Sequence, residues 1–166
     1  RYKTAFSLMM IDLDHFKVYN DTYGFLMGDE MLCLTARVLG DWLNRLPEGA
    51  RLGHIGGDDF VIVNRGIIRG EVLECLCSGF DAEKLGLFKN EDVERGCILG
   101  AADRQGNPLI TPLITMSVAV IDSSKVWVDP HPALFSEVAA SLKKKVKRLT
   151  AETGKSGYLL EQRLHV

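Results

Sequence analysis

The stretch "RLGHIGGDDFVIV", residues 51–63, predicts a β-hairpin with acidic residues at its tip. Its two ends, "RLGHI" and "DFVIV", are short and rich in apolar side chains, which is typical of strands. Gly56 and Gly57 link them, and a Gly-Gly link favours a tight turn because glycine tolerates positive φ. Asp58 and Asp59 therefore lie at the tip of the predicted hairpin.

A second pair of acids follows another predicted strand. The run "AFSLMMIDLD", residues 5–14, is almost continuously apolar before its acids, which favours a buried central strand. Asp12 and Asp14 come at the end of that strand. If the strand lies beside the hairpin, all four carboxylates meet at one edge of a sheet.

Carboxylates at strand ends are the hard oxygen ligands that Mg²⁺ prefers, at roughly 2.0–2.1 Å. Mg²⁺ usually completes its coordination with substrate phosphates, so the pattern points to a nucleoside triphosphate. The glycines leave the backbone open to a phosphate or a metal ion. A lone Asp-x-Asp is usually a strand end or a helix cap, and a lone Gly-Gly-Asp is usually a turn. The two patterns together, each attached to a predicted strand, favour a metal site.

The remaining sequence predicts helices and strands in alternation. Helical patterns cover residues 15–24, 28–46 and 67–80, and a last helix begins at Pro132. That helix carries an apolar stripe of Phe135, Val138, Leu142, Val146 and Leu149. A hairpin turning at residues 105–108 runs into another buried strand, and "GYLLEQ" predicts a short final strand. The order of elements predicts an α/β sandwich, with a mainly antiparallel central sheet flanked by helices.

Composition sets the limits of this interpretation. The chain has 166 residues, 46% hydrophobic and 25% charged, which suits one globular domain. A net charge of -2 argues against nucleic-acid binding. No apolar run approaches the roughly 20 residues that cross a bilayer, and no signal peptide is recognisable, so no direct membrane insertion is expected. We expect a single cytoplasmic domain over residues 1–166, excised from a longer multidomain signalling protein.

Two motifs give the chain a family resemblance. "DLDHFKVYNDTYGFLMGDEML", residues 12–32, followed by "HIGGDDFVIV", resembles the GGDEF domain of diguanylate cyclases. The matching positions of the first motif are Asp12, Phe16, Lys17, Asn20, Asp21, Gly24, Gly28 and Asp29. "GGDDF" stands where that family has GGDEF, and "TMSVAV" is similar to a later family strand. The long segment "RGCILGAADRQGNPLITPL" resembles a subgroup in which the domain follows EAL and CBS domains.

The resemblance implies a palm-like nucleotide-cyclase fold and a reaction. Family members condense two GTP molecules to cyclic di-GMP with Mg²⁺ or Mn²⁺, and each subunit of a homodimer presents one GTP. By resemblance, Asp12 and Asp59 are the catalytic metal ligands, helped by the Leu13 carbonyl. Linked sensory or EAL domains are the implied partners.

The resemblance also implies how the nucleotide is held. Asn20 and Asp29 would recognise guanine, since an amide and a carboxylate can pair with its donor-rich edge. The backbone around His15, Phe16 and Lys17 would hold the terminal phosphates. Lys145 matches a phosphate-binding lysine on the last helix.

Several positions depart from the family pattern. Asp59 replaces a glutamate and is one methylene shorter, and a displacement of about 1 Å can cost about 100-fold in catalysis. His54 replaces an arginine, and Phe25 replaces a histidine. The stretch "VKRLTAETGKSGYLL" has extra residues, with Arg148 an approximate stand-in for a second phosphate-binding cation. "PEGA", residues 47–50, lacks the Arg-x-x-Asp of the family's product-inhibition site.

Three functions are therefore open. An active diguanylate cyclase is favoured by the intact first motif and by a carboxylate at Asp59. A catalytically degenerate GTP-binding module, controlling a linked domain such as an EAL phosphodiesterase, is favoured by the shorter acid and the altered C-terminal motif. A palm like that of CRISPR type III polymerase subunits fits "GGDD" but not "DLDHFKVYNDTYG". Cyclase chemistry ranks first, because aspartate is a competent Mg²⁺ ligand.

Overall fold

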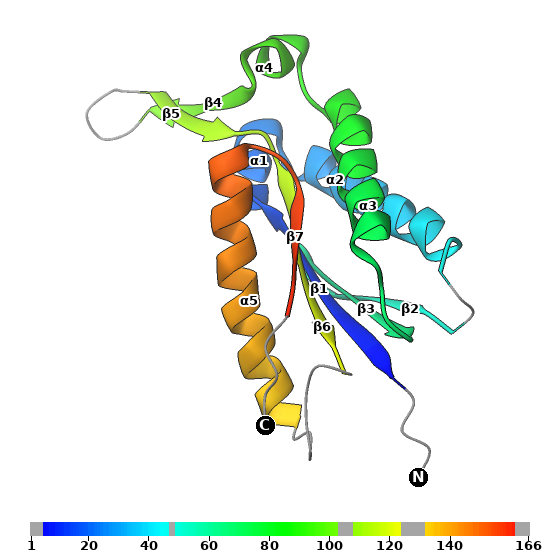
Figure 1. Cartoon of the computed structure of the whole chain (residues 1–166). Coiled ribbons are helices and arrows are strands. Elements are labelled where there is room, and N and C mark those ends of the chain that lie inside the picture. The colour runs from blue at the N-terminus through cyan, green and yellow to red at the C-terminus, as the bar shows by residue number, and fades with distance from the viewer. Residues whose placement is uncertain (1–4, 47–48, 103–107, 124–131, 162–166) are drawn as a thin grey trace.

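The computed structural model describes residues 5–46, 49–102, 108–123 and 132–161 (Figure 1). The elements follow in the order β1 (Phe6–Asp14), α1 (Phe16–Tyr23), α2 (Phe25–Leu43), β2 (Arg51–Gly56), β3 (Asp59–Arg65), α3 (Gly70–Glu83), the 3-10 helix η1 (Lys84–Leu87), α4 (Asn90–Arg95), β4 (Cys97–Ala102), β5 (Pro108–Pro112), β6 (Thr115–Asp122), α5 (Pro132–Thr153) and β7 (Gly157–Leu160).

Five strands form the central sheet, in the order β2-β3-β1-β6-β7. Every neighbouring pair is antiparallel except β6 and β7, which run parallel. The strand β1 therefore lies in the middle, with the β2–β3 hairpin on one side and β6 on the other. The antiparallel pair β4–β5 forms a separate two-stranded sheet that projects away from the central one (Figure 1).

The alternation of side chains along β1 divides the core between the two faces of the sheet. Met9, Ile11 and Leu13 are buried in the large cluster that includes residues of α2 and α3. Leu8 and Met10 pack on the other face, against apolar side chains of α5. Since successive side chains of a strand point to opposite faces, Asp12 and Asp14 point to the α5 face.

The helix α5 follows the stripe predicted for it. Val138, Leu142 and Val146 are buried against the sheet, and these residues recur every four positions. Figure 1 shows α5 on one side of the sheet and α2 and α3 on the other. The predicted α/β architecture with a mainly antiparallel sheet is confirmed.

The boundaries of several elements differ from the prediction. The helix predicted over residues 28–46 runs over Phe25–Leu43, because Gly24, at φ 88°, ends α1 and α2 begins at the next residue. The helix predicted over residues 67–80 is Gly70–Glu83. The short helices η1 and α4 lack a long apolar period and were not predicted. Of the turn predicted at residues 105–108, residues 105–107 lie outside the described residues, and Pro108 begins β5.

A membrane-spanning helix must be both long and strongly apolar, and no helix in the described part of the chain is both.

Candidate functional site

Asp12 and Asp59 lie opposite each other on the neighbouring strands β1 and β3. They are direct partners in the antiparallel register of β1 and β3. Residues directly opposite each other in such a pair project from the same face, so both carboxylates lie on the α5 side. The juxtaposition that the sequence predicted from two separate motifs is therefore present.

Asp58 joins this pair to form the acidic triad Asp12–Asp58–Asp59. One carboxylate oxygen from each residue lies within 4.8 Å of the others. The Leu13 amide donates a hydrogen bond to the Asp58 carbonyl at 3.3 Å, which ties the turn to the end of β1. Burial raises the pKa of the Asp58 carboxyl, and the charges of Asp12 and Asp59 raise it further. Three carboxylates this close repel one another, so the triad needs positive charge nearby.

Two lysines of α5 supply that charge. The Lys143 ammonium lies 2.7 Å from Asp12 Oδ2 and 2.5 Å from Asp59 Oδ1. The Lys147 ammonium lies 2.5 Å from Asp12 Oδ1 and 3.8 Å from Asp14 Oδ1. Burial lowers the pKa of Lys143, but hydrogen bonds to Asp12 and Asp59 outweigh it, so the pKa is raised overall. The nearly buried Asp12 is thus paired with a cation at each of its oxygens.

Asp14 does not join the triad. Its Oδ2 accepts hydrogen bonds from the hydroxyls of Thr115 at 2.8 Å, Ser117 at 2.6 Å and Thr150 at 2.9 Å. The expectation that all four carboxylates converge is therefore corrected to three, because Asp14 lies one pleat further on and meets hydroxyls of β6 and α5. Asp14 braces the end of β1 against these two elements.

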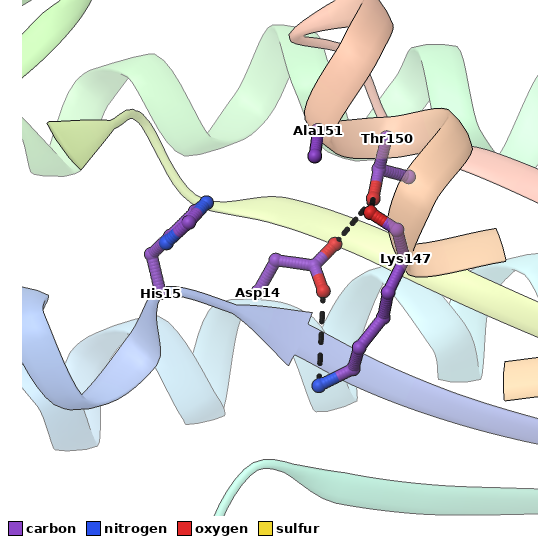
Figure 2. A pocket seen from close by; sticks show the side chains of 5 residues that line it. All are labelled: Asp14, His15, Lys147, Thr150 and Ala151. Atoms are coloured by element: carbon purple, nitrogen blue, oxygen red, sulfur yellow. Dashed lines mark hydrogen bonds and ion pairs between the residues drawn. The ribbon is translucent and has the colours of Figure 1, made fainter. Parts of the chain in front are cut away.

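A cavity of about 250 Å³ lies beside Asp14. Figure 2 shows Asp14 and His15 on one side of it, and Lys147, Thr150 and Ala151 of α5 on the other. Lys147 thus borders both the triad and this cavity. Its side chain is 41% exposed, so it is partly open to solvent.

The turn between β2 and β3 depends on the backbone conformation of its two glycines. Gly56 and Gly57 have φ of 148° and 56°, values that side-chain-bearing residues rarely adopt. A Cβ at either position would have no neighbour within 4 Å, so conformation rather than crowding requires glycine here. His54 holds the turn from β2: its Nε2 is hydrogen-bonded to the Gly57 carbonyl at 2.8 Å, and its ring stacks on Phe60.

The start of α1 lies directly after β1. His15 has left-handed backbone angles, φ 65° and ψ 13°, and is the residue before the helix. The first N–H groups of a helix have no partner within the helix, and they suit an anion. The Lys17 side chain is 90% exposed and pairs with Asp21 at 3.4 Å, one turn along. The predicted phosphate-binding segment, His15 to Lys17, is therefore adjacent to the acids.

Asn20 and Asp29 come from adjacent helices. Asn20 lies on α1 against Gly28 of α2, the residue before Asp29. The Asn20 Oδ1 is buried and has no hydrogen-bond partner within the described part of the chain. A buried polar atom without a partner is costly, which favours a ligand that satisfies it. Asp29 is exposed.

The lysines of α5 differ in their surroundings. Lys145 is exposed, and its role as a phosphate ligand stays a prediction, whereas Lys143 and Lys147 contact the acids. Sequence reasoning missed these two. The signal was available: Lys143, Lys147 and Thr150 are spaced by four and three residues, which puts them on one helix face beside the apolar stripe.

The donor set fits a divalent cation. The acidic triad offers carboxylate oxygens on a rigid strand and a tight turn, which is what Mg²⁺ and Mn²⁺ accept. The neighbouring helix start and the accessible lysines suit phosphate oxygens, and Asn20 offers an unpaired polar group further along α1. Chemically, the arrangement can bind a metal ion together with a polyphosphate.

Several known proteins are similar to this chain. The family model described as "Diguanylate cyclase, GGDEF domain" matches residues 1–89. The chain is 32% identical to diguanylate cyclase DosC of Escherichia coli K12 over 120 residues, which cover 70% of this chain and 25% of that protein. It is 44% identical over 59 residues to an uncharacterized 19.3 kDa protein of Streptomyces ambofaciens, covering 36% of this chain and 31% of the other. The chain thus spans about a third or less of these curated relatives.

Two solved structures share the fold. The active GGEEF domain of a diguanylate cyclase from Vibrio cholerae has a TM-score of 0.62 at 20% identity, covering 97% of this chain and 85% of that one. Diguanylate cyclase SiaD of Pseudomonas aeruginosa, solved with its activator SiaC, has a TM-score of 0.63 at 23% identity, covering 97% of this chain and 52% of that one. At these identities the likeness concerns the fold alone.

Proposed function

The chain belongs to the GGDEF diguanylate cyclase family, whose domains serve cyclic di-GMP signalling, and on that premise we propose that it binds GTP with Mg²⁺. The observation that carries the proposal is the register that places Asp12 opposite Asp59, with Asp58 beside them. We propose Asp12 and Asp59 as metal ligands, with the Leu13 carbonyl completing the protein's contribution.

When bound there, Mg²⁺ would neutralise phosphate charge and favour ionisation of the ribose 3'-hydroxyl. The protein's own groups would do the rest. The backbone N–H groups that follow His15 would hold the terminal phosphates, with Lys17 and Lys147 as accessible cations. Asn20 and Asp29 would pair with guanine, and binding would satisfy the buried Asn20 Oδ1.

The reaction we propose is condensation of two GTP molecules to cyclic di-GMP. Each 3'-hydroxyl attacks the α-phosphate of the other nucleotide, and pyrophosphate leaves in each of the two steps. One site holds one GTP, so two copies of the domain must meet face to face. Domains linked to this one in the whole protein, sensory or EAL, would bring the copies together.

A second candidate is a GTP-binding module that regulates a linked EAL domain without turning over its ligand. Two observations favour it. The aspartate at position 59 is shorter than the family's glutamate, and the Lys143 ammonium lies between the two proposed metal ligands. Either feature can leave nucleotide binding intact while it misplaces the metal ion for catalysis.

A product assay separates the two candidates. The longest soluble form of the protein, at high concentration, is incubated with GTP and Mg²⁺ or Mn²⁺, and cyclic di-GMP is sought by chromatography. Cyclase activity predicts product in the wild type and none in Asp59→Ala. Absence of product from wild type and from Asp59→Glu, with GTP binding confirmed in the same samples, supports the regulatory module.

A further inference from the structure

Lys143 occupies an unusual place in the proposed metal site. Its ammonium lies 2.7 Å from Asp12 Oδ2 and 2.5 Å from Asp59 Oδ1, so one cation bridges the two acids that face each other across β1 and β3. The Lys143 side chain is 25% exposed and the Asp12 side chain 5% exposed. Because water has little access to these two side chains, their ion pair is stronger than one between fully exposed side chains.

A divalent ion shared by Asp12 and Asp59 would need the space that the Lys143 ammonium occupies. Mg²⁺ binds carboxylate oxygens at roughly 2.0–2.1 Å, so a metal ion held by both Asp12 and Asp59 would need the space between them that the Lys143 ammonium fills. Two cations cannot lie there together, both for lack of room and because like charges repel at such short range. Metal binding at this pair therefore requires Lys143 to leave.

Lys147 is not subject to the same conflict. Its ammonium contacts Asp12 Oδ1 and lies 3.8 Å from Asp14 Oδ1. Among the described residues it has no ion pair with Asp59, and it borders the cavity beside Asp14. It can stay beside Asp12 while an ion binds between Asp12 and Asp59. The competition is thus specific to one of the two lysines.

We infer that Lys143 is an internal counter-ion of the acidic triad, which competes with the divalent cation and is displaced when the cation binds. The inference rests on the proposed metal site. It gives Lys143 a role other than phosphate binding. Lys143 neutralises the facing carboxylates before the metal binds, and it raises the metal concentration that fills the site.

The first test measures Mn²⁺ affinity by electron paramagnetic resonance of the free ion, without nucleotide. Lys143→Met keeps the length of the side chain and removes the competitor, so it should bind Mn²⁺ at least about tenfold more tightly than wild type, as loss of one charged hydrogen bond implies. Lys144→Met, at an exposed neighbouring position of α5, is the matched control and should change affinity less than about twofold.

The second test follows the displacement itself in the wild-type protein. Lysine amines are labelled with an acetylating reagent, with and without saturating Mn²⁺, and each site is quantified by mass spectrometry. Labelling of Lys143 should rise several-fold when Mn²⁺ is present, because its ammonium is freed, while labelling of exposed Lys144 stays constant. This readout needs no variant and no catalysis.

The outcomes distinguish the two claims. Tighter binding by Lys143→Met together with metal-dependent labelling of Lys143 supports displacement. Equal Mn²⁺ affinity in Lys143→Met and wild type overturns the competition and leaves the metal site standing. Tighter binding with unchanged Lys143 labelling also overturns it, because a charge acting at a distance then explains the affinity. Absence of Mn²⁺ binding by either protein, with GTP added as well as without it, overturns the metal site and this inference with it.

Discussion

Gly28 of α2 and the side chain of Asn20 on α1 adjoin so closely that no atom fits between them: a Cβ added at Gly28 would lie 1.8 Å from Asn20 Oδ1. The glycine is buried in a helix and has ordinary helical φ, so its conformation does not require it. Its absent side chain instead fixes where the Asn20 amide lies.

Gly28→Ala should therefore weaken guanine-nucleotide binding while the fold is retained. The atom that must move is the end of a side chain, so Asn20 can swing aside at little cost in stability. Loss of its contact with guanine should reduce GTP affinity by about tenfold, which corresponds to about one hydrogen bond. Calorimetric titration with GTP and Mg²⁺ measures the change.

Gly40→Ala provides the control in the same helix. A Cβ at Gly40 would have no neighbour within 4 Å. This variant should gain about 0.5–1 kcal/mol of stability from the better helix former and keep the wild-type GTP affinity. If Gly28→Ala binds GTP as well as Gly40→Ala does, Asn20 does not contact the nucleotide.

His54 should act on metal binding through the turn. Its hydrogen bond to the Gly57 carbonyl and its stacking on Phe60 hold the residues on both sides of Asp58 and Asp59. His54→Ala should lower Mn²⁺ affinity about three- to tenfold, since one hydrogen bond contributes roughly 0.5–1.5 kcal/mol. Arg51→Ala, exposed on the same strand, is the control. Unchanged Mn²⁺ affinity in His54→Ala would show that the turn is rigid without the histidine.

Asp14 should be required for stability. Its carboxylate accepts hydrogen bonds from three buried hydroxyls, which join β1 to β6 and α5. Asp14→Ala removes all three hydrogen bonds and leaves Ser117 and Thr150 only their weaker contacts, with each other and with the Lys147 carbonyl. It should lower the free energy of unfolding by about 2–5 kcal/mol in chemical denaturation. Asp21→Ala, at an exposed acid, should change it by less than about 0.5 kcal/mol. A similar, small effect of both substitutions contradicts the bracing role.

Tyr23 and Asp92 should give the domain part of its acid sensitivity. The hydrogen bond from the Tyr23 hydroxyl is the main cause that lowers the pKa of Asp92 below its ordinary 3.8; burial opposes it, and Arg95 adds to it. A carboxyl whose folded pKa is depressed stabilises the protein above its unfolded pKa, and this stability is lost as pH falls through the folded pKa.

Tyr23→Phe should therefore cost about 2 kcal/mol in free energy of unfolding near neutral pH, and progressively less below the ordinary pKa of Asp92. Denaturant titrations at about pH 7 and about pH 3 compare the two regimes. A loss of equal size at both pH values would mean that the hydroxyl acts independently of the Asp92 charge, through the hydrogen bond that it accepts from the Lys89 amide. Phenylalanine keeps the ring contacts with Tyr19 and Phe88, so packing does not account for the loss.

The sequence predicts this fold well where local patterns and tertiary contacts agree. The apolar run before Asp12 is the central strand, and the Gly-Gly link is the hairpin turn that places Asp59 opposite it. The period of α5 correctly predicts its buried face. The helices η1 and α4 escape prediction because they are one or two turns long, too short for a period to show.

The site is less predictable, because two of its features depend on packing between distant elements. Nothing local shows that Asp14 will meet three hydroxyls from β6 and α5 while Asp12, two residues earlier, faces β3. The choice among the lysines of α5 depends on how the helix is rotated over the sheet. That rotation buries Val146, turns Lys143 and Lys147 toward the acids, and leaves Lys145 in solvent.

The most direct test of the central claim is the affinity for GTP with and without Mg²⁺, in wild type and in Asp59→Ala, with Asp21→Ala as the control. A metal-bound nucleotide at the triad predicts that Mg²⁺ strengthens GTP binding at least about tenfold in wild type and in the control, and has no effect in Asp59→Ala. An equal Mg²⁺ effect in Asp59→Ala and wild type would contradict the account.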